Sequence, residues 1–530
     1  MLILLPEIII CAGALLVAIL GAAPPGPRAA PRAGWTAFAF CLLSFLCLPA
    51  THYLLPTGIS PLPSWLSAAL SFDPFALFFR LFAPSAGLIV ILSSLGYVRA
   101  RALPHPGEFY GLLLFALLGI MLLAEAVDII TIILSLELLS ASCYVLTAFI
   151  KKDQRSAEGG LKYFLVGAIS TAIMLYGLSL LFGLTGSTSL AGIATALKSS
   201  PVGTLTTLAV VLTLVGFAFK VALVPFHTWC PDAYQGAPTP ITAFLSVGPK
   251  AAGFAVLSRV FLTCFSPDVA SWPYLLAGLS IVSMTVGNLL AIPQTNIKRM
   301  LAYSSISQAG YLLIGLVCAT PWAAAAGTGS SPAHAAQSLL PGGPAFGISA
   351  LLLYLAAYLF MNLGAFLVVI AVARRTGTYA IPDYSGLMQE SPFLAVSLAV
   401  FFLSLAGVPP TGGFVGKLYL FAAAIGSGLW WLAVAGVVNS VISLYYYFNV
   451  VRNMFMRQAS PSPTASEPLR AEPEGPGGTA AVLTGAGFAG PRVSSLSFAI
   501  AICLILTFLI ALMPEGFISF ARSCASGLGQ

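Results

Sequence analysis

Four ionisable residues stand inside long apolar stretches of this sequence, namely Glu137, Lys220, Lys250 and Lys417. A charge at the centre of a membrane helix costs roughly 2.5–3.5 kcal/mol on insertion scales, so such residues usually pair or mark an ion path. Burial favours the neutral forms of amines and carboxyl groups, and pairing opposes that effect. We therefore predict a proton relay. The alternatives are a static ion pair between Glu137 and Lys220, and a Lys417 side chain that extends to the membrane surface.

Prolines accompany two of these lysines in the stretch 217–250, which is FAFKVALVPFHTWCPDAYQGAPTPITAFLSVGPK. Pro225 follows Lys220 by five residues, and Pro249 directly precedes Lys250. Proline removes a backbone donor and kinks or breaks a helix. Broken helices at membrane depth occur where they face protein or a water-filled cavity. This stretch therefore predicts two antiparallel membrane helices, both bent beside a buried amine.

Several polar residues near the lysines are weaker candidates. His227 could pass protons because an imidazole titrates near neutral pH, or it could form a hydrogen bond at a helix end. Asp232 suits a cap or turn after this helix. Ser304, Ser305, Ser307 and Gln308 would line a hydrated path or form hydrogen bonds between helices. Glu125, Asp128 and Arg80 are interpreted as packing or interface charges.

The composition of the chain indicates that these residues lie within an integral membrane protein. The chain has 530 residues, of which 59% are hydrophobic and only 7% charged, whereas soluble proteins have about 25% charged residues. Spans need about 20 apolar residues each. We predict an all-α integral membrane protein with about fourteen transmembrane helices. Their ranges are 2–22, 34–52, 73–97, 108–125, 128–149, 160–184, 205–228, 239–262, 272–292, 299–319, 345–373, 392–426, 428–451 and 494–521.

The orientation follows from the basic residues of the connections. With the N-terminus outside, sixteen of the 23 Lys and Arg residues, including Lys298, fall in inside connections, and two fall outside. Because basic residues favour the cytoplasmic side, both termini are predicted to be outside, which is the periplasmic side.

An internal repeat sets the predicted domain organisation. LVPFH in the seventh span and GVPPTGG in the twelfth indicate two broken helices, one in each of two inverted five-helix repeats. In sequence, Lys220 precedes its break and Lys417 follows its own. The predicted parts are a three-helix segment (1–107), two repeats (108–262 and 272–451), a flexible cytoplasmic linker (457–493) and a C-terminal helix (494–530).

Longer motifs around these residues resemble a known family. The segments FKVALVPFHTWCPDAYQGAPTPITAFLSVGPK, NIKRMLAYSSISQAGYLLIG and LSLAGVPPTGGFVGKLYLF resemble the antiporter-like membrane subunits of respiratory complex I. The segment YFLVGAISTAIMLYGLSLLFG, and a lysine rather than a glutamate in the twelfth span, are most similar to the subunit N branch of that family. The resemblance covers about residues 70–455.

This resemblance implies a proton-translocating subunit of NADH:quinone oxidoreductase in the bacterial inner membrane. It implies that Glu137 and Lys220 form a pair, that Lys250 is the central lysine, and that Lys417 is the lysine of the twelfth span. NADH, FMN, iron–sulfur clusters and quinone would belong to partner subunits, with no cofactor or metal in this chain. The nine cysteines agree with this, since they show no metal-ligand spacing. The expected partners are other complex I membrane subunits and lipid, not nucleic acid.

Two other functions remain open at this point. A subunit of a multi-subunit sodium/proton antiporter would share these helices. An accessory membrane scaffold would use the buried charges only to hold helices together, and it would tolerate their removal in the assembled complex.

Overall fold

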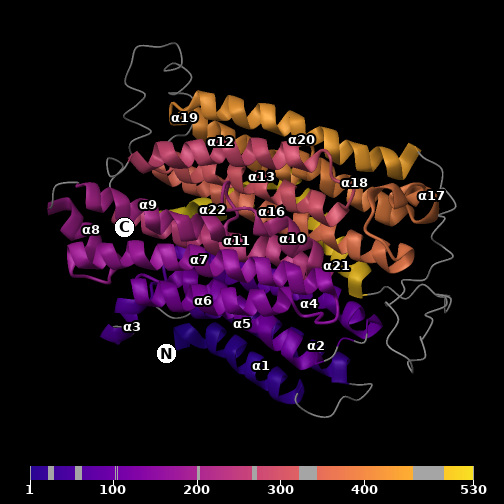
Figure 1. Ribbon diagram of the computed structural model, residues 1–530, viewed down its shortest axis with the longest axis horizontal. Coiled ribbons are helices and arrows are strands. Elements are labelled where there is room, and N and C mark those ends of the chain that lie inside the picture. Colours follow the sequence, from indigo (N-terminus) through magenta and orange to yellow (C-terminus); the bar gives the residue numbers. More distant parts are fainter. Residues whose placement is uncertain are drawn as a thin grey trace.

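The chain folds into a bundle of helices that lie side by side along the long axis of the molecule (Figure 1). The computed structural model describes residues 2–21, 29–53, 63–101, 103, 105–199, 203–265, 271–320, 343–456 and 495–528. Within these residues, eleven helices are long and apolar enough to cross a membrane, and α1, α9, α18 and α19 are shorter apolar helices. This confirms the prediction of an all-α membrane protein.

The helices are as follows, in chain order: α1 (Leu5–Gly21), α2 (Ala29–Tyr53), α3 (Ser64–Ala69), α4 (Pro74–Ala100), α5 (Pro106–Glu125), α6 (Ile129–Thr147), α7 (Gln154–Thr185), α8 (Leu190–Ser199), α9 (Thr204–Lys220), α10 (Trp229–Gly236), α11 (Thr239–Cys264), α12 (Trp272–Ala291), α13 (Ile297–Cys318), α16 (Pro344–Thr376), α17 (Leu387–Glu390), α18 (Pro392–Ala406), α19 (Gly412–Gly426), α20 (Trp430–Met456), α21 (Ser495–Leu512) and α22 (Pro514–Ala525). Short 3₁₀ turns cover Leu2–Leu4, Ile381–Tyr384 and Ser526–Leu528.

Two helices are broken where the prolines predict it. The chain leaves α9 at Lys220 and re-enters a helix at Trp229, and a second break separates α18 from α19. In contrast, Pro249 lies inside α11, which continues from Thr239 to Cys264, so the helix that carries Lys250 is not broken. Pro249 has no N–H to donate to the carbonyl of Leu245 four residues earlier, and the hydroxyl of Tyr234 donates to that carbonyl instead, at 3.3 Å.

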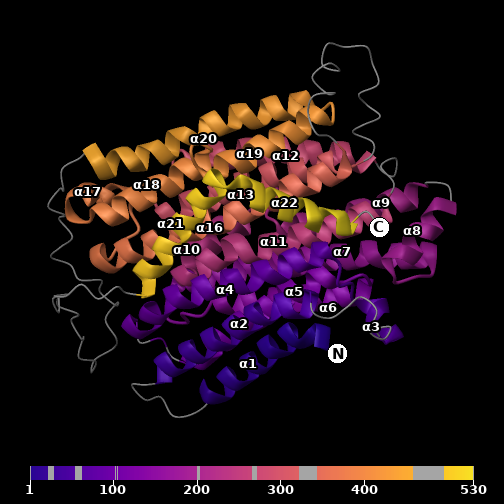
Figure 2. The ribbon, with the colours of Figure 1, turned by 180° about the vertical axis from the view of Figure 1, so that it is seen from behind.

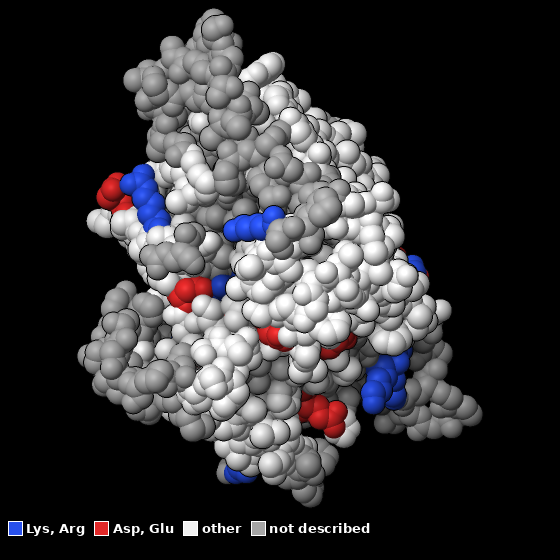
Figure 3. Space-filling model, turned by 90° about the vertical axis from the view of Figure 1, so that its left-hand side faces the viewer, with Lys and Arg blue, Asp and Glu red and all other residues white. Residues whose placement is uncertain are grey.

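The connections gather at two opposite ends of the bundle. Isolated bridges join Leu70 to Ala126 and Asp128 to Ser189, which places three connections at one end. A further bridge joins Asn296 to Ala380. The start of α1 and the end of α22 lie at the same end of the bundle (Figures 1 and 2). That end exposes only scattered charged side chains (Figure 3).

Helices α11, α13 and α16 form the interior of the bundle. The most apolar part of α11 is completely buried, and those of α13 and α16 are mostly buried. Helices α7, α20 and α21 lie at the periphery and expose large apolar side chains such as Phe164, Val441 and Ile505. A membrane protein can expose such residues because lipid is as apolar as they are.

Two predicted segments differ from the structure or lie outside it. The last span ends at Leu512 rather than at 521, because Pro514 cannot donate to the preceding turn and begins the separate helix α22. The predicted linker 457–493 lies outside the described residues.

Candidate functional site

The first buried amine stands at the first helix break. Lys220 is the last residue of α9, and only 1% of its surface is exposed. Its Nζ donates to the hydroxyl of Ser140 on α6 at 2.9 Å. A lysine at a helix C-terminus lies at the negative end of the helix dipole, which favours its charge. The hydrogen bond to Ser140 and the helix dipole at the break therefore offset part of the cost of burying the positive charge of Lys220.

Glu137 does not pair directly with Lys220. Among the ion pairs of the described residues, none joins these two side chains, although Glu137 lies close enough to interact electrostatically with the amine. Glu137 is half-buried, and its Oε1 is buried without a hydrogen-bond partner. The hydroxyl of Ser140, one turn further along α6, accepts the hydrogen bond from the amine instead. A hydroxyl thus stands where the expected carboxylate contact would be.

The second amine belongs to the innermost helix. Lys250 on α11 is 1% exposed, and its Nζ donates to the backbone carbonyl of Ser305 on α13 at 2.5 Å. Gly253, almost one turn further along α11, faces Lys220, since a Cβ built there would lie 3.4 Å from Lys220 Cγ and closer still to Val221. The absence of a side chain at Gly253 lets α11 pass directly against the first break.

The polar face of α13 carries the contacts onward from Lys250. The Ser305 hydroxyl accepts from Tyr358 on α16 at 2.9 Å and lies 3.4 Å from the Tyr234 hydroxyl. Gln308 binds Tyr354 on α16 and donates to the Leu405 carbonyl of α18 at 3.0 Å. Ser304 forms a hydrogen bond with Tyr447 on α20. These residues form hydrogen bonds between helices, whereas Ser307 has no side-chain partner in the described part of the chain.

The third amine stands at the second break. Lys417 on α19 is 2% exposed, and its Nζ donates to the Ala406 carbonyl at 3.0 Å and to the Ser440 hydroxyl at 2.9 Å. The amine also lies 4.3 Å from the centre of the Tyr311 ring, which is within the range of a cation–π interaction. Gly407 has a φ of +87°, and a Cβ there would lie 2.8 Å from Lys417 Cδ.

A second set of polar residues joins α20 to α12 near Lys417. Asn288 donates to the backbone carbonyl of Asn439 at 2.9 Å and accepts from Tyr446 at 3.1 Å. Asn439 directly precedes Ser440, the hydroxyl partner of Lys417. Tyr446 directly precedes Tyr447, which binds α13. These contacts form an interrupted row through the interior of the bundle, which we call the polar axis. It consists of Ser140, Lys220, Lys250, Ser304, Ser305, Gln308, Lys417 and Ser440, together with their tyrosine and asparagine partners.

His227 lies apart from these contacts. It falls in the break between α9 and α10, is half-buried, and its Nδ1 has no hydrogen-bond partner within the described residues. No hydrogen bond links its side chain to Lys220 or Lys250 there. The structure therefore does not bring His227 onto the polar axis.

Two further charged residues near the bundle end have structural partners. Lys298 is buried rather than being a loop charge, and its Nζ donates to the carbonyls of Gln235 and Ala237. It satisfies the end of α10, whose last carbonyls lack partners within the helix. Asp232 binds Lys162 at 2.7 Å and Arg299 at 2.5 Å. Burial raises the pKa of Asp232, but these two hydrogen bonds outweigh burial and hold the pKa below its usual value.

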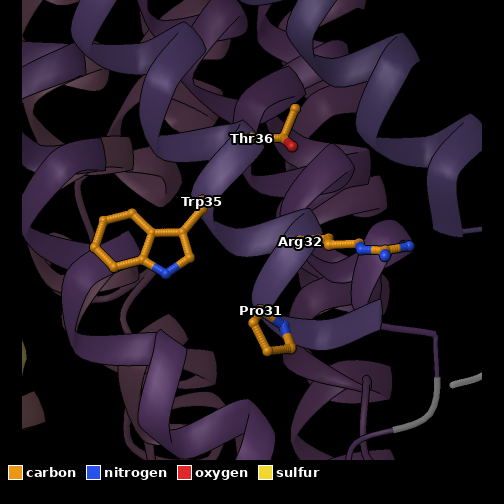
Figure 4. Close-up of a pocket in the computed structure, with 4 residues that line it drawn as sticks. All are labelled: Pro31, Arg32, Trp35 and Thr36. Atoms are coloured by element: carbon orange, nitrogen blue, oxygen red, sulfur yellow. The ribbon is translucent and has the colours of Figure 1, made fainter. Parts of the chain in front are cut away.

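Two cavities differ in their relation to the axis. One, of about 280 Å³, is lined by Lys417, Ser440 and apolar residues that include Leu418 and Val441. The other, of about 410 Å³, is a shallow surface site beside Pro31, Arg32, Trp35 and Thr36 on α2 (Figure 4). In the close-up, the Trp35 and Arg32 side chains point to opposite sides of α2. Only the first cavity reaches a relay residue.

Sequence reasoning missed the tyrosines and asparagines of the axis. Tyr354 and Tyr358 are one turn apart on α16, and Asn288 and Asn439 lie on different helices. Polar groups recurring at helical spacing inside apolar runs are the signal that could have found the tyrosines. The two asparagines are far apart in sequence, so only packing brings them together.

The chain matches known proteins over most of its length. The family model of the NADH:quinone oxidoreductase/Mrp antiporter membrane region matches residues 126–340 and 328–443. NAD(P)H-quinone oxidoreductase subunit 2 of Prochlorococcus marinus is 42% identical over 464 residues, which is 88% of this chain and 81% of the relative. NADH-quinone oxidoreductase subunit N of Trichlorobacter lovleyi is 43% identical over 421 residues, with coverages of 78% and 81%.

Solved structures agree with these relatives. A chain of respiratory complex I from Thermus thermophilus with bound Aureothin matches with a TM-score of 0.71 and 30% identity, covering 97% of this chain and 98% of that one. A chain of the Mrp complex from Dietzia matches with a TM-score of 0.81 at 21% identity, covering 99% and 97%, and supports the fold alone. The predicted family is confirmed: this chain belongs to the antiporter-like membrane subunits of NADH:quinone oxidoreductase, in the branch of subunit N.

Proposed function

We propose that this chain translocates protons as a membrane subunit of NADH:quinone oxidoreductase, and that Lys220, Lys250 and Lys417 carry them along the polar axis. The observation that supports this most directly is the chemistry of their partners. Each amine is bound by hydroxyl or carbonyl oxygens, and none of the three belongs to an ion pair among the described residues.

Neutral partners make proton transfer feasible. A buried lysine locked to a carboxylate leaves an unpaired buried charge when it loses its proton, and this is strongly unfavourable. An amine held by a hydroxyl or carbonyl leaves no such charge behind. Serine and tyrosine hydroxyls can both donate and accept, so Ser305, Tyr358 and Tyr447 suit the gaps between amines. Glu137 would be the first carboxylate of the relay, and His227 would act at its edge.

The source of energy lies outside this chain in the proposal. As a subunit of an enzyme complex, the chain would couple proton movement to quinone reduction elsewhere. NADH, FMN, iron–sulfur clusters and quinone would bind partner subunits. The partners would be the other membrane subunits, including related antiporter-like ones, in the bacterial inner membrane with both termini of this chain on the periplasmic side.

The fourteen-span arrangement of two inverted repeats is part of the same proposal. It is supported by the two helix breaks, by the gathering of alternate connections at opposite ends, and by the shared end of α1 and α22. The segment 1–107, the repeats 108–262 and 272–451, and the C-terminal part 494–530 would be its units.

Lys250 offers the sharpest test because it is the most central amine. Lys250→Arg keeps a positive charge but cannot release a proton at any accessible pH. We expect NADH-driven proton pumping in proteoliposomes to fall by at least tenfold in Lys250→Arg and in Lys250→Ala, with the complex still assembled on a native gel. Full pumping in Lys250→Arg would show that only a fixed charge is needed. Pumping that requires sodium would favour sodium/proton antiport.

A further inference from the structure

A second group of buried charges lies away from the lysines, where α1, α4 and α5 meet. Glu7, Arg80 and Glu125 are 3%, 2% and 0% exposed. Arg80 binds Glu7 through two parallel hydrogen bonds, Nε to Oε1 at 2.8 Å and NH2 to Oε2 at 2.9 Å. The same NH2 donates to the Ile3 carbonyl at 2.6 Å. The guanidinium of Arg80 is therefore directed at Glu7 and the N-terminal turn.

Glu125 enters this group without a hydrogen-bond donor. Its Oε1 lies 2.9 Å from Arg80 Nε, but that N–H points at Glu7. Neither oxygen of Glu125 accepts a hydrogen bond from any described residue. Glu7 Oε1 and Glu125 Oε1 thus lie 2.8 and 2.9 Å from the same nitrogen, Arg80 Nε. Two buried carboxyl groups are therefore close together, and the arginine donates hydrogen bonds to only one of them, Glu7.

The surrounding charges do not make up the difference. Arg259 of α11 is committed to Asp73, with NH1–Oδ2 at 2.7 Å and NH2–Oδ1 at 3.0 Å, and to the Ala124 carbonyl. Asp128 caps α6 by accepting from Ile130 N and brings no positive charge. With every group ionised, two arginines would face the three carboxylates of Glu7, Asp73 and Glu125. One buried negative charge would remain uncompensated.

We propose that Glu7 and Glu125 share one bound proton beside Arg80, and that they form a proton-binding site separate from the polar axis. A neutral carboxylic acid can donate to a neighbouring carboxylate, so one shared proton would give a hydrogen bond to one of the two Glu125 oxygens, neither of which has a partner among the described residues. Like charges this close cannot both ionise readily in a low-dielectric site. A metal ion fits less well, because the positive charge of Arg80 already lies against both carboxyl groups and the described residues contain no cluster of three metal ligands there.

The place of this proton in the fold gives it a structural consequence. Glu125 ends α5, and the next helix, α6, carries Glu137 and Ser140. The Ala124 carbonyl binds Arg259 of α11, the helix that also carries Lys250. Loss of the proton would place an unpaired charge where α1, α4 and α5 meet, and would loosen the packing of α1 against α5.

Infrared spectroscopy of the assembled complex tests the proposal directly. The wild type should show a carbonyl-stretch band of protonated carboxyl groups at neutral pH that shifts in deuterated water. Glu125→Gln should lose that band, as should Glu7→Gln, because each leaves one carboxylate paired with Arg80. The control Asp128→Asn removes a nearby carboxyl group that lies outside this cluster and accepts from Ile130 N, and it should leave the band unchanged.

Several outcomes would overturn the proposal. Spectra of Glu125→Gln and Glu7→Gln that match the wild type would show that both groups are ionised. A band that appears only when sodium is replaced by choline would show that a sodium ion, not a proton, neutralises the site. Failure of both variants to assemble would also contradict it, because glutamine reproduces the neutral acid that the proposal requires.

Discussion

The amine of Lys417 donates a hydrogen bond to the carbonyl oxygen of Ala406, across the second helix break, at 3.0 Å. Ala406 is the last residue of α18, so its carbonyl is one that the helix leaves without a partner. Lys220 is itself the last residue of α9. Although Lys417 follows its break in sequence and Lys220 precedes its own, both amines therefore lie at the C-terminal end of the half-helix before the break.

The contact between Lys220 and Ser140 should matter for pumping. Ser140→Ala removes the only hydrogen-bond acceptor of the amine among the described residues, a loss of about 1.5–3 kcal/mol for a bond to a charged group. We expect proton pumping to fall severalfold with the complex assembled. Ser135→Ala on the same helix, whose hydroxyl has no relay contact, is the matched control. Equal pumping in Ser140→Ala and the control would contradict a role for this contact.

Glu137 and Lys220 should act as a coupled pair even though they do not touch in this structure. Glu137→Gln and Lys220→Ala are each expected to depress pumping, and the double variant should lose less than the sum of the two effects, because both act on one proton. The measurement is a double-mutant cycle of pumping in proteoliposomes, with assembly checked on native gels. Strict additivity would mean that the two residues work independently, and loss of assembly would favour a scaffold role.

Gly407 should be required for the position of Lys417. Alanine at a φ of +87° is strained by roughly 1–2 kcal/mol, and its Cβ would press on Lys417 Cδ at 2.8 Å. We expect Gly407→Ala to reduce pumping with little loss of assembled complex. Gly278→Ala on α12, where an added Cβ meets no atom, is the control. Unchanged pumping in Gly407→Ala would show that the amine tolerates displacement.

Water should reach Lys417 through the cavity between α19 and α20. Leu418 and Val441 line this cavity and are exposed, whereas Leu420 and Ala424, one and two turns beyond Lys417, are fully buried. The exposure of Leu418 and Val441 is to lipid or to water, and a small charged thiol reagent tells the two apart. We expect cysteines at Leu418 and Val441 to react, because such a reagent reaches them only where water fills the cavity, and cysteines at Leu420 and Ala424 should not react. Labelling from the outside only would support an outlet at Lys417. Labelling of Leu418 and Val441 cysteines from the inside only would reverse the direction assigned to the relay.

Asp232 should contribute to the stability of the protein against unfolding at low pH, at the end of the bundle where α7, α10 and α13 meet. Because its folded-state pKa is lowered by Lys162 and Arg299, its contribution to stability is present above the usual aspartate pKa and is lost as the pH falls through the lowered value. Asp232→Asn should cost about 0.5–1 kcal/mol at neutral pH, since the pairs are partly exposed. The unfolding temperature in detergent should also fall less steeply with decreasing pH in Asp232→Asn than in the wild type.

The control for this measurement is Glu390→Gln. Glu390 is exposed and forms no ion pair within the described residues. The unfolding temperature of Glu390→Gln should fall with decreasing pH as that of the wild type does. A fall in Asp232→Asn as steep as in the wild type would assign acid sensitivity to other carboxylates.

The sequence alone determined the membrane fold, the two breaks and the burial of the three lysines. These properties are local, because the cost of burying a charge and the missing N–H of proline apply wherever the residue stands. The family was also accessible, since long motifs such as LSLAGVPPTGGFVGKLYLF carry it. A proline alone does not distinguish a broken helix from a continuous one, since Pro249 lies inside the continuous helix α11.

The tertiary structure decided which polar groups meet. Nothing in the local sequence places the Ser305 carbonyl under Lys250 or Ser440 beside Lys417, because helix rotation and packing set those contacts. Packing likewise buried Lys298 against two carbonyls and placed Ser140, rather than Glu137, on Lys220. It also brought Glu7, Arg80 and Glu125 together from three helices, since a side chain's partners depend on which helix faces turn inward.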